Sequence, residues 1–407
     1  MKILAVLALL PVLAQAQALP VFNPSGPDAD AYGAAENYPV RYIGPNRTQS
    51  HLVGAFSHSD KLTPFHTAAK AAKPVALGRA PSEISLSYHY RGRTGTIADY
   101  LSRHPATGLL ILKDRTILAE HYQYGRTDRD RFVSQSMAKT VTAMLVGIAV
   151  AEGKIRSIDD LAEVYAPQLA GSAVGATSIR ALLHMASGIA FREVYDGRDD
   201  SAALNAAMFP KGNPGAMQGV RQFNIRETPP DTHWHYKGLD TVTLGLVLTA
   251  ATGMPMADYL ASRVWSRIGT EADAIWSVDQ KGVEVAMCCL SATLRDFGRF
   301  GALLAADGAW DGQQIIPADW VRAATSVQAP FLAPGKDAGY YGYGYQVWLL
   351  PGARRQFVLL GIHGQAIYVD PAAKLVLVHT AVRTRPTGDP TTPELGAFWR
   401  ALVAQEG

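Results

Sequence analysis

Strand-like segments lie near both ends of this 407-residue chain, and helical segments lie between them. Near the start, GLLILKDRTILAEHYQYG (108–125) predicts two apolar strands joined at Lys113-Asp114-Arg115, which is typical of a hairpin. Near the end, four short apolar runs are separated by Gly, Pro or charged residues: YGYGYQVWLL, RQFVLLGI, GQAIYVD and KLVLVHTAV. The simplest arrangement is one antiparallel sheet built from both ends of the chain and flanked by helices, an α+β fold.

The middle of the chain predicts an inserted helical region. Apolar residues recur at spacings of three and four in SIRALLHMASGI and DTVTLGLVLTAATG, and PELGAFWRALVAQ predicts a closing amphipathic helix. We expect an α/β domain over 81–156 and 265–407, with the mainly helical residues 157–264 forming the other wall of a cleft. Residues 19–80, rich in Pro, Gly, Ser and Asn, predict an irregular N-terminal extension.

Residues 1–18, MKILAVLALLPVLAQAQA, predict a secretory signal peptide. Lys2 supplies the positive start, an apolar stretch follows, and Ala-x-Ala provides a cleavage site. The apolar run is shorter than the roughly 20 residues that span a bilayer. We therefore expect export, to the periplasm or outside the cell, with no stable membrane insertion after cleavage.

Composition and the remaining motifs exclude several functions. The formal net charge is +3 and no basic run is present, so we expect no nucleic-acid partner. His233 and His235 lack further ligands at a familiar spacing, and Gly-rich phosphate loops are absent, so we expect neither metal nor cofactor. A bond between the adjacent Cys288 and Cys289 would be strained, so we expect two free, buried thiols.

Lys139 is the single charged residue in the apolar segment MAKTVTAMLVGIAVA (137–151), three residues after Ser136. On a helix these two side chains share a face, and Ser136 would lie at the N-terminus, where the dipole favours negative charge. Burying an unpartnered ammonium is costly, and a partly neutral lysine can take a proton from a serine hydroxyl. The pattern predicts a nucleophile and its base; the alternative is a chance match with a lysine that reaches solvent.

Several further segments stand in a familiar order, and with them the chain resembles the penicillin-recognising serine hydrolases. This superfamily contains class C β-lactamases, related esterases and 6-aminohexanoate-dimer hydrolases, in which Ser-x-x-Lys carries nucleophile and base. The resemblance is greatest to the 6-aminohexanoate-dimer hydrolase and esterase branch, through CCLSATLRDFGRFG and GIHGQ. It implies a β-lactamase/transpeptidase-like fold. The matching segments are LLHMASGIAFREVY (182–195), TPPDTHWHYKGLDTVTLGLVLTAATG (228–253), VEVAMCCLSATLRDFGRFGALL (283–304), GQQIIPADWV (312–321) and GIHGQAIYVDP (361–371).

The resemblance implies a mechanism for small ester or linear amide substrates. Ser136 would attack the carbonyl, Lys139 would take its proton, and Tyr236 would relay that proton to the leaving group. The backbone N–H groups of Ser136 and Ile362 would bind the oxyanion. The alternative for Tyr236 is a structural tyrosine packed beside its aromatic neighbours.

Two motifs depart from the family pattern. Tyr236-Lys237-Gly238 stands where Tyr-x-Asn is expected, and Leu359-Leu360-Gly361 stands where β-lactamases have Lys-Thr-Gly. The groups that hold a β-lactam carbonyl and carboxylate are therefore missing, so we expect no efficient β-lactam hydrolysis. A β-lactamase, a peptidoglycan D,D-peptidase and a non-catalytic sensor with this fold remain the alternatives.

Four residues are candidates for substrate contact: Tyr195, Gly361, His363 and Gln365. Tyr195 would line the rim of the cleft, with a structural role as the alternative, and His363 could equally hydrogen-bond behind the site. Glu193 we expect to be a surface loop charge. The sequence leaves the acyl group, the leaving group and the oligomeric state open.

Overall fold

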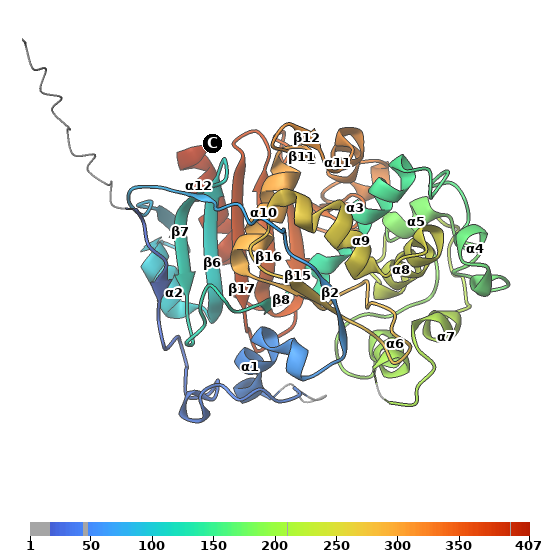
Figure 1. Ribbon diagram of the computed structural model, residues 1–407, viewed down its shortest axis with the longest axis horizontal. Coiled ribbons are helices and arrows are strands. Elements are labelled where there is room, and N and C mark those ends of the chain that lie inside the picture. The colour runs from blue at the N-terminus through green and yellow to red at the C-terminus, as the bar shows by residue number, and fades with distance from the viewer. Residues whose placement is uncertain (1–16, 44–47, 210, 391) are drawn as a thin grey trace, which may run out of the picture.

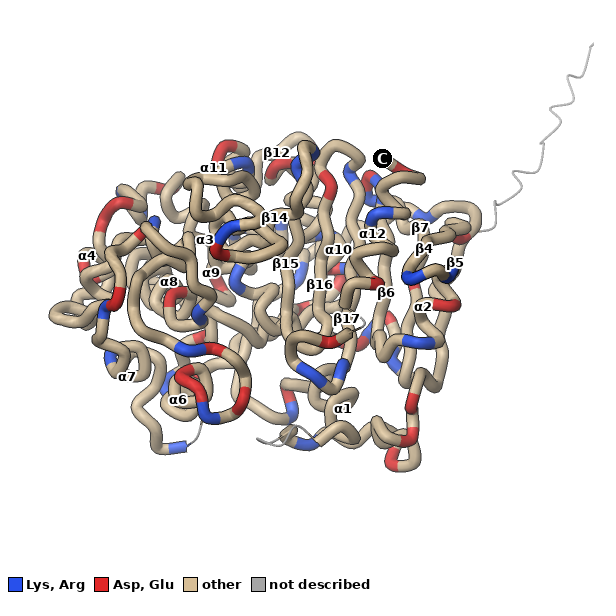
Figure 2. Tube along the Cα trace, turned by 180° about the vertical axis from the view of Figure 1, so that it is seen from behind, with Lys and Arg blue, Asp and Glu red and all other residues tan. Residues whose placement is uncertain are grey.

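The computed structural model describes residues 17–43, 48–209, 211–390 and 392–407, so the predicted signal peptide lies almost wholly outside the described residues. A large sheet with helices on both faces forms one side of the molecule, and a helical region forms the other (Figure 1). The α+β architecture expected from the sequence is confirmed. Basic and acidic residues are interspersed over the molecule (Figure 2).

The central sheet has nine strands and joins both ends of the chain, because β6 near the start pairs with β17 near the end. Its order is β1-β7-β6-β17-β16-β15-β14-β13, antiparallel from β7 to β13. The edge strands β1 and β3 pair with β7 in parallel, so the expectation of a wholly antiparallel sheet was wrong at this edge. The strands are β1 (Val21–Phe22), β3 (Gly78–Arg79), β6 (Ala106–Lys113), β7 (Thr116–Tyr122), β13 (Gly342–Tyr343), β14 (Trp348–Leu349), β15 (Phe357–Gly361), β16 (Gln365–Asp370) and β17 (Leu375–Ala381).

The predicted hairpin is the β6–β7 pair. Its two-residue turn places Asp114 at φ 45° and Arg115 at φ 64°, as the favoured hairpin turns require. The prediction of one strand over YGYGYQVWLL was wrong, because the backbone turns between β13 and β14 at Gln346, which has φ 57°. The Gln346 side chain donates to the Leu182 carbonyl at 2.8 Å and accepts from the Thr241 hydroxyl at 2.6 Å. These bonds tie the turn to the helical region.

Helices cover both faces of the sheet. On one face α2 (Ile97–Arg103) and α12 (Thr392–Glu406) pack with Leu109 and Ile111 of β6. On the other, α10 (Leu294–Ala305) lies so close that a Cβ at Gly298 would come within 2.7 Å of Leu110. Since successive strand residues face opposite sides, β6 is apolar along its whole length.

The helical region packs against α3 (Ala138–Ala151), which contacts α8. Within the described residues no single helix is long and apolar enough to cross a membrane. The pair formed by α8 and by α9 with the turn that follows it, Met256–Ile268, has the length and composition of a membrane span, but it is bent by 70°. The predicted domain boundaries remain predictions. The helices of this region are α4 (Ala162–Tyr165), α5 (Ile179–Leu183), α6 (Asp200–Met208), α7 (Ala216–Arg221), α8 (Gly238–Thr252) and α9 (Met256–Arg263).

A second sheet of four strands, in the order β2-β9-β10-β8, leads the chain into the segment around Ser136. Residue Ser134, directly after β8, donates its backbone N–H to the Leu290 carbonyl at 2.7 Å. The remaining elements are β2 (Phe65–Ala68), β4 (Ser87–Tyr90), β5 (Arg93–Thr96), β8 (Phe132–Val133), β9 (Ala274–Ser277), β10 (Leu290–Ala292), β11 (Ala309–Trp310), β12 (Gln313–Gln314), α1 (Leu52–Ser57) and α11 (Ala318–Ala324).

Candidate active site

Ser136 lies in a single 3₁₀ turn, Gln135–Met137, that continues directly into α3. The preceding residue, Gln135, has φ 45°, a left-handed conformation that is uncommon for a residue with a side chain. Strained backbone of this kind concentrates at functional sites, where the surrounding structure holds it. The turn places the Ser136 hydroxyl at the N-terminus of an otherwise buried helix.

Lys139 is 2% exposed, and its ammonium has two partners. Nζ donates to the Ser136 Oγ at 3.0 Å and to the Met287 carbonyl at 3.0 Å. It also lies 4.9 Å from the centroid of the Tyr236 ring, within the range of a cation–π contact. The apolar helix therefore carries a fixed amine beside a serine hydroxyl.

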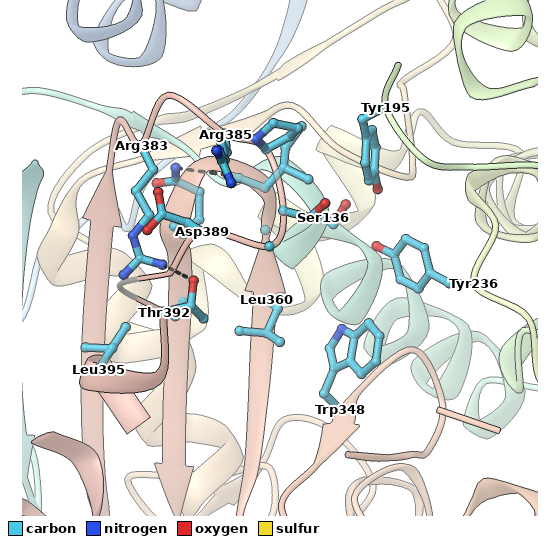
Figure 3. A pocket seen from close by; sticks show the side chains of 18 of the residues that line it. Ser136, Tyr195, Tyr236, Trp348, Leu360, Arg383, Arg385, Asp389, Thr392 and Leu395 are labelled. Atoms are coloured by element: carbon cyan, nitrogen blue, oxygen red, sulfur yellow. Dashed lines mark hydrogen bonds between the residues drawn. The ribbon is translucent and has the colours of Figure 1, made fainter. Parts of the chain in front are cut away.

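Tyr236 lies in the loop that leads into α8, with its ring beside the Lys139 ammonium. Its ring stacks on Trp348, with centroids 5.4 Å apart and planes inclined by 24°. Figure 3 shows the Tyr195 and Tyr236 hydroxyls pointing toward the space around Ser136. The stacking fixes the Tyr236 ring so that its hydroxyl faces the cleft.

The end of β15 lies against the turn that precedes Ser136. A Cβ at Gly361 would come within 2.5 Å of the Ser134 carbonyl oxygen and 2.9 Å of the Gln135 Cβ, so only glycine allows this approach. The next residue, Ile362, lines the same cavities as Ser136. The two backbone segments expected to bind an oxyanion are thus adjacent.

Glu193 occupies the region where the family pattern has an asparagine. Its Oε2 accepts the Gly238 backbone N–H at 2.5 Å and its Oε1 accepts the Tyr195 hydroxyl at 2.6 Å. A Cβ at Gly238 would lie 2.3 Å from the Met287 Sδ, so a side chain there would require Met287 to move. The expectation that Glu193 is a surface loop charge was wrong, because its carboxylate binds the Gly238 N–H and the Tyr195 hydroxyl. The glycine at position 238, where the family pattern has an asparagine, was the one departure in the sequence that pointed to this region.

Burial raises the pKa of Tyr195, and the charges of Tyr236 and Glu193 raise it further. Tyr195 is therefore a hydrogen-bond donor at every pH at which a protein of this kind works. It lines both cavities beside Ser136, and its contact with substrate remains a prediction.

His363 and Gln365 are buried and bonded to the protein. The ring of His363 packs edge-on against Phe56 at 5.3 Å, and its Nδ1 hydrogen-bonds with the Arg383 carbonyl. It lines a neighbouring cavity with Phe56 and neither of the two cavities beside Ser136. The Gln365 amide donates to the Ala381 carbonyl at 2.6 Å and accepts the Ala381 N–H at 3.1 Å. Gln365 lines the larger cavity, but its polar atoms hold β16 to β17.

Two cavities meet at Ser136, of about 520 and 430 Å³, in the usual range for small-molecule sites. Both are lined by Ser136, Glu193, Tyr195 and Ile362. Sequence reasoning did not single out the walls of the larger cavity, which carry no motif. They include Tyr341, Trp348, Leu360, Tyr368, Arg383, Arg385, Asp389 and Leu395.

Cys288 and Cys289 form a disulfide, which overturns the expectation of two free thiols. The prediction assumed an ordinary backbone, but Cys289 has φ 70°, a left-handed conformation that allows adjacent side chains to meet. The pair is half-buried, and Cys288 lines the smaller cavity. It directly follows Met287, whose carbonyl holds Lys139.

Comparison with known proteins shows the family to which the chain belongs. The β-lactamase family model matches residues 95–397. A 6-aminohexanoate-dimer hydrolase of Paenarthrobacter ureafaciens is 26% identical over 284 residues, covering 66% of this chain and 70% of that protein.

Solved structures share the fold. A protein from Bacillus anthracis assigned by name to the 6-aminohexanoate-dimer hydrolases superposes with a TM-score of 0.78 at 22% identity, covering 88% of this chain and 94% of the other. A D-stereospecific amidohydrolase from Streptomyces sp. gives 0.54 at 17% identity, covering 75% and 94%. Because the family model spans well over half of the chain, this protein belongs to the β-lactamase family of serine hydrolases.

Proposed function

We propose that this protein is an exported serine hydrolase that cleaves small ester or linear amide bonds through an acyl-enzyme on Ser136. The observation that carries the proposal is the 3.0 Å hydrogen bond from Lys139 Nζ to Ser136 Oγ, in a cleft that Tyr236 also borders. A nucleophile and a base within hydrogen-bond reach, with the base oriented by a third group, are the signature of covalent catalysis. Here the Met287 carbonyl is the orienting group.

Acylation begins when Ser136 Oγ attacks the substrate carbonyl carbon and its proton passes to Lys139 Nζ. The backbone N–H groups of Ser136 and Ile362 stabilise the oxyanion; in other enzymes one such donor contributes about 3 kcal/mol. Tyr236 donates a proton to the leaving alcohol or amine as the carbon–heteroatom bond breaks, and Lys139 restores that proton. Water then attacks the acyl carbon and gives its proton to Lys139, which is again neutral. As the bond between the acyl carbon and Ser136 Oγ breaks, Tyr236 protonates Oγ and Lys139 returns the proton to Tyr236, which releases the acid and free Ser136.

Linear amides and esters fit this cleft better than β-lactams. Leu359 and Leu360 replace the cation and hydroxyl that bind a β-lactam carboxylate, and Gly238 leaves no amide for the β-lactam carbonyl. The relative from Paenarthrobacter ureafaciens is named for a linear amide substrate. A non-catalytic sensor is disfavoured because Ser136, Lys139 and Tyr236 are all present and adjacent.

Export is supported by the pattern of residues 1–18. The Cys288–Cys289 disulfide agrees with it, because disulfides persist mainly in oxidising compartments. Detection of the mature chain in the periplasm or medium, beginning near residue 17 or 19, tests this part; retention of Met1–Ala18 in cytosolic protein contradicts it.

Hydrolysis of p-nitrophenyl butyrate, 6-aminohexanoate dimer and nitrocefin by the wild type and Ser136→Ala tests the activity. We expect turnover of the ester or the linear amide, little of nitrocefin, and none by Ser136→Ala. Ser262→Ala, at an exposed position of α9, is the matched control and keeps full activity. Equal turnover by Ser136→Ala and the wild type contradicts the proposal.

A further inference from the structure

A buried lysine directly follows Tyr236, and the mechanism proposed above does not use it. Lys237 is 1% exposed, and its backbone is extended immediately before α8 begins. It lines neither of the two cavities beside Ser136, whereas Tyr236 borders the larger one. An ammonium buried next to a catalytic residue requires partners, because an unpaired buried charge is costly.

The Lys237 ammonium bonds to the segment 187–195, which ends at Tyr195. Nζ donates to the Ile189 carbonyl oxygen at 2.8 Å. The hydroxyls of Tyr236 and Tyr195 point toward the space around the nucleophile from two different segments of the chain (Figure 3). The Lys237 bond therefore joins the segment that carries one hydroxyl to the segment that carries the other.

Two further hydrogen bonds join the same pair of segments. The Gly238 N–H donates to Glu193 Oε2 at 2.5 Å. The Ser187 N–H donates to Asp240 Oδ2 at 3.3 Å. The start of α8 is thus held to the neighbouring segment at three points, and Lys237 supplies the cation among them.

Asp240 brings an opposite charge into the same buried region. Its side chain is 0% exposed, and its Oδ1 has no hydrogen-bond partner among the described residues. Burial raises the pKa of Asp240 to about 6, although the charges of Lys237 and Arg226 lower it. Removal of the lysine charge therefore leaves a buried carboxylate less well compensated, and the double variant that removes both charges is the fairer test of the fold.

We propose that Lys237 is a positioning residue for Tyr236, because its buried ammonium holds the start of α8 against the segment that carries Tyr195. The proposal rests on the proposed function, in which the Tyr236 hydroxyl protonates the leaving group. Proton transfer requires the two heavy atoms within hydrogen-bond reach. A displacement of about 1 Å can cost on the order of 100-fold in rate, so a bond behind the tyrosine is sufficient to affect turnover.

Kinetics of Lys237→Met test the effect on turnover. Methionine keeps the apolar stem and removes the ammonium, and we expect kcat for p-nitrophenyl butyrate to fall about 10- to 100-fold while KM changes little. Lys154→Met, at an exposed position, is the matched control and keeps the wild-type kcat. The thermal midpoint establishes that each variant is folded. Lys237→Met/Asp240→Asn should show the same loss of kcat and replaces the single variant if that does not fold.

A double-mutant cycle separates positioning of the Tyr236 hydroxyl from a general structural effect. If Lys237 acts through that hydroxyl, then Lys237→Met should lower kcat by less than about twofold further when it is added to Tyr236→Phe. An equal loss of kcat in the Tyr236→Phe and wild-type backgrounds overturns the proposal. So does a folded Lys237→Met variant with the wild-type kcat.

Fluorine NMR of 3-fluorotyrosine incorporated at position 236 tests the positioning without catalysis. In the Ser136→Ala background we expect the resonance to shift or broaden when Lys237→Met is added, and to stay unchanged with Lys154→Met. Identical spectra with and without Lys237→Met overturn the proposal. A shifted resonance in a protein whose Ser136 form hydrolyses no ester or amide would support the positioning and contradict the proposed function, so the two proposals fail separately.

Discussion

Two buried cations border the same cleft and are used differently. Lys139 is 2% exposed, and its ammonium bonds to the Ser136 Oγ and the Met287 carbonyl and faces the Tyr236 ring. Arg383 is 4% exposed, and its guanidinium bonds to the Thr392 hydroxyl at 2.7 Å through Nη1. Burial is nearly equal, so burial alone does not distinguish the two roles.

The two residues differ in the groups that their side-chain N–H groups bind. The Lys139 nitrogen bonds to the Ser136 Oγ, so in its neutral form the same nitrogen is placed to accept the serine proton. Arg383 stays protonated, and its Nη1 donates to the Thr392 hydroxyl at the start of α12. This contrast predicts that changes at Lys139 act on kcat, whereas changes at Arg383 act on stability.

The substitution Lys139→Met should have the largest effect on kcat. Methionine keeps the apolar stem but removes the base, and we expect kcat for p-nitrophenyl butyrate to fall about 10⁴-fold. Circular dichroism and the thermal midpoint serve as folding controls. If the variant keeps kcat and changes only KM, then Lys139 binds substrate and is not the base.

Tyr236→Phe sharpens the role of the Lys139 side of the cleft. The ring can still stack on Trp348, so binding should change little, while loss of the hydroxyl should lower kcat about 10³-fold. Steady-state kinetics separate the two parameters. Trp348→Phe, which alters the stack and keeps the Tyr236 hydroxyl, is the comparison variant. A larger kcat loss in Trp348→Phe than in Tyr236→Phe would mean that the ring, and not the hydroxyl, matters.

Glu394 supports the Arg383 side through α12, two residues from the Thr392 anchor. Burial raises the pKa of this carboxyl, but hydrogen bonds from Tyr88, Arg103 and His104 outweigh it and lower the pKa to about 2. A lowered folded-state pKa means that the carboxylate stabilises the fold above about pH 4.5. That stability is lost as the pH falls toward 2.

The wild type should therefore lose up to about 3 kcal/mol more unfolding free energy between pH 5 and 2 than Glu394→Gln. Urea unfolding at several pH values measures this difference. The exposed Glu36, whose ion pair with Arg41 lies at the surface, provides the control as Glu36→Gln, which should follow the wild type. If Glu394→Gln and the wild type lose the same unfolding free energy between pH 5 and 2, then Glu394 does not stabilise this region through its charge.

The Cys288–Cys289 disulfide should have the smallest effect. It follows the Met287 carbonyl that holds Lys139, so its removal should weaken one hydrogen bond, worth about 1 kcal/mol or about fivefold in kcat. Kinetics of the Cys288→Ser/Cys289→Ser variant, with and without a reductant, measure it. An unchanged kcat would show that the disulfide does not hold the Met287 carbonyl in place for Lys139.

Much of the fold could be predicted because its signals are local. The β6–β7 hairpin, α8 and α12 each have a periodic apolar pattern, and the i, i+3 spacing placed Ser136 and Lys139 on one face. The β13–β14 turn could not be predicted, since it depends on Gln346 bonds to residues more than 100 positions away. The parallel edge strands β1 and β3 are two residues long and carry no pattern.

The proximity of Ser136, Lys139 and Tyr236 could be predicted from the sequence, and the walls of the cavities could not. Ser136, Lys139 and Tyr236 belong to spaced motifs, whereas Glu193 and Arg383 lie in loops where charged residues are usually solvated. Their roles depend on partners supplied by the fold: Gly238 and Tyr195 for Glu193, and Thr392 and Gly364 for Arg383. The disulfide likewise depended on one backbone angle at Cys289.

The most direct test of the nucleophile is intact mass after rapid mixing of the protein with a p-nitrophenyl ester, followed by peptide mapping. We predict one added acyl group on the peptide that contains Ser136, absent from Ser136→Ala and long-lived in Tyr236→Phe, in which deacylation is slowed. An acyl group on any other residue, or hydrolysis by Ser136→Ala at the wild-type rate, would contradict the central role of Ser136.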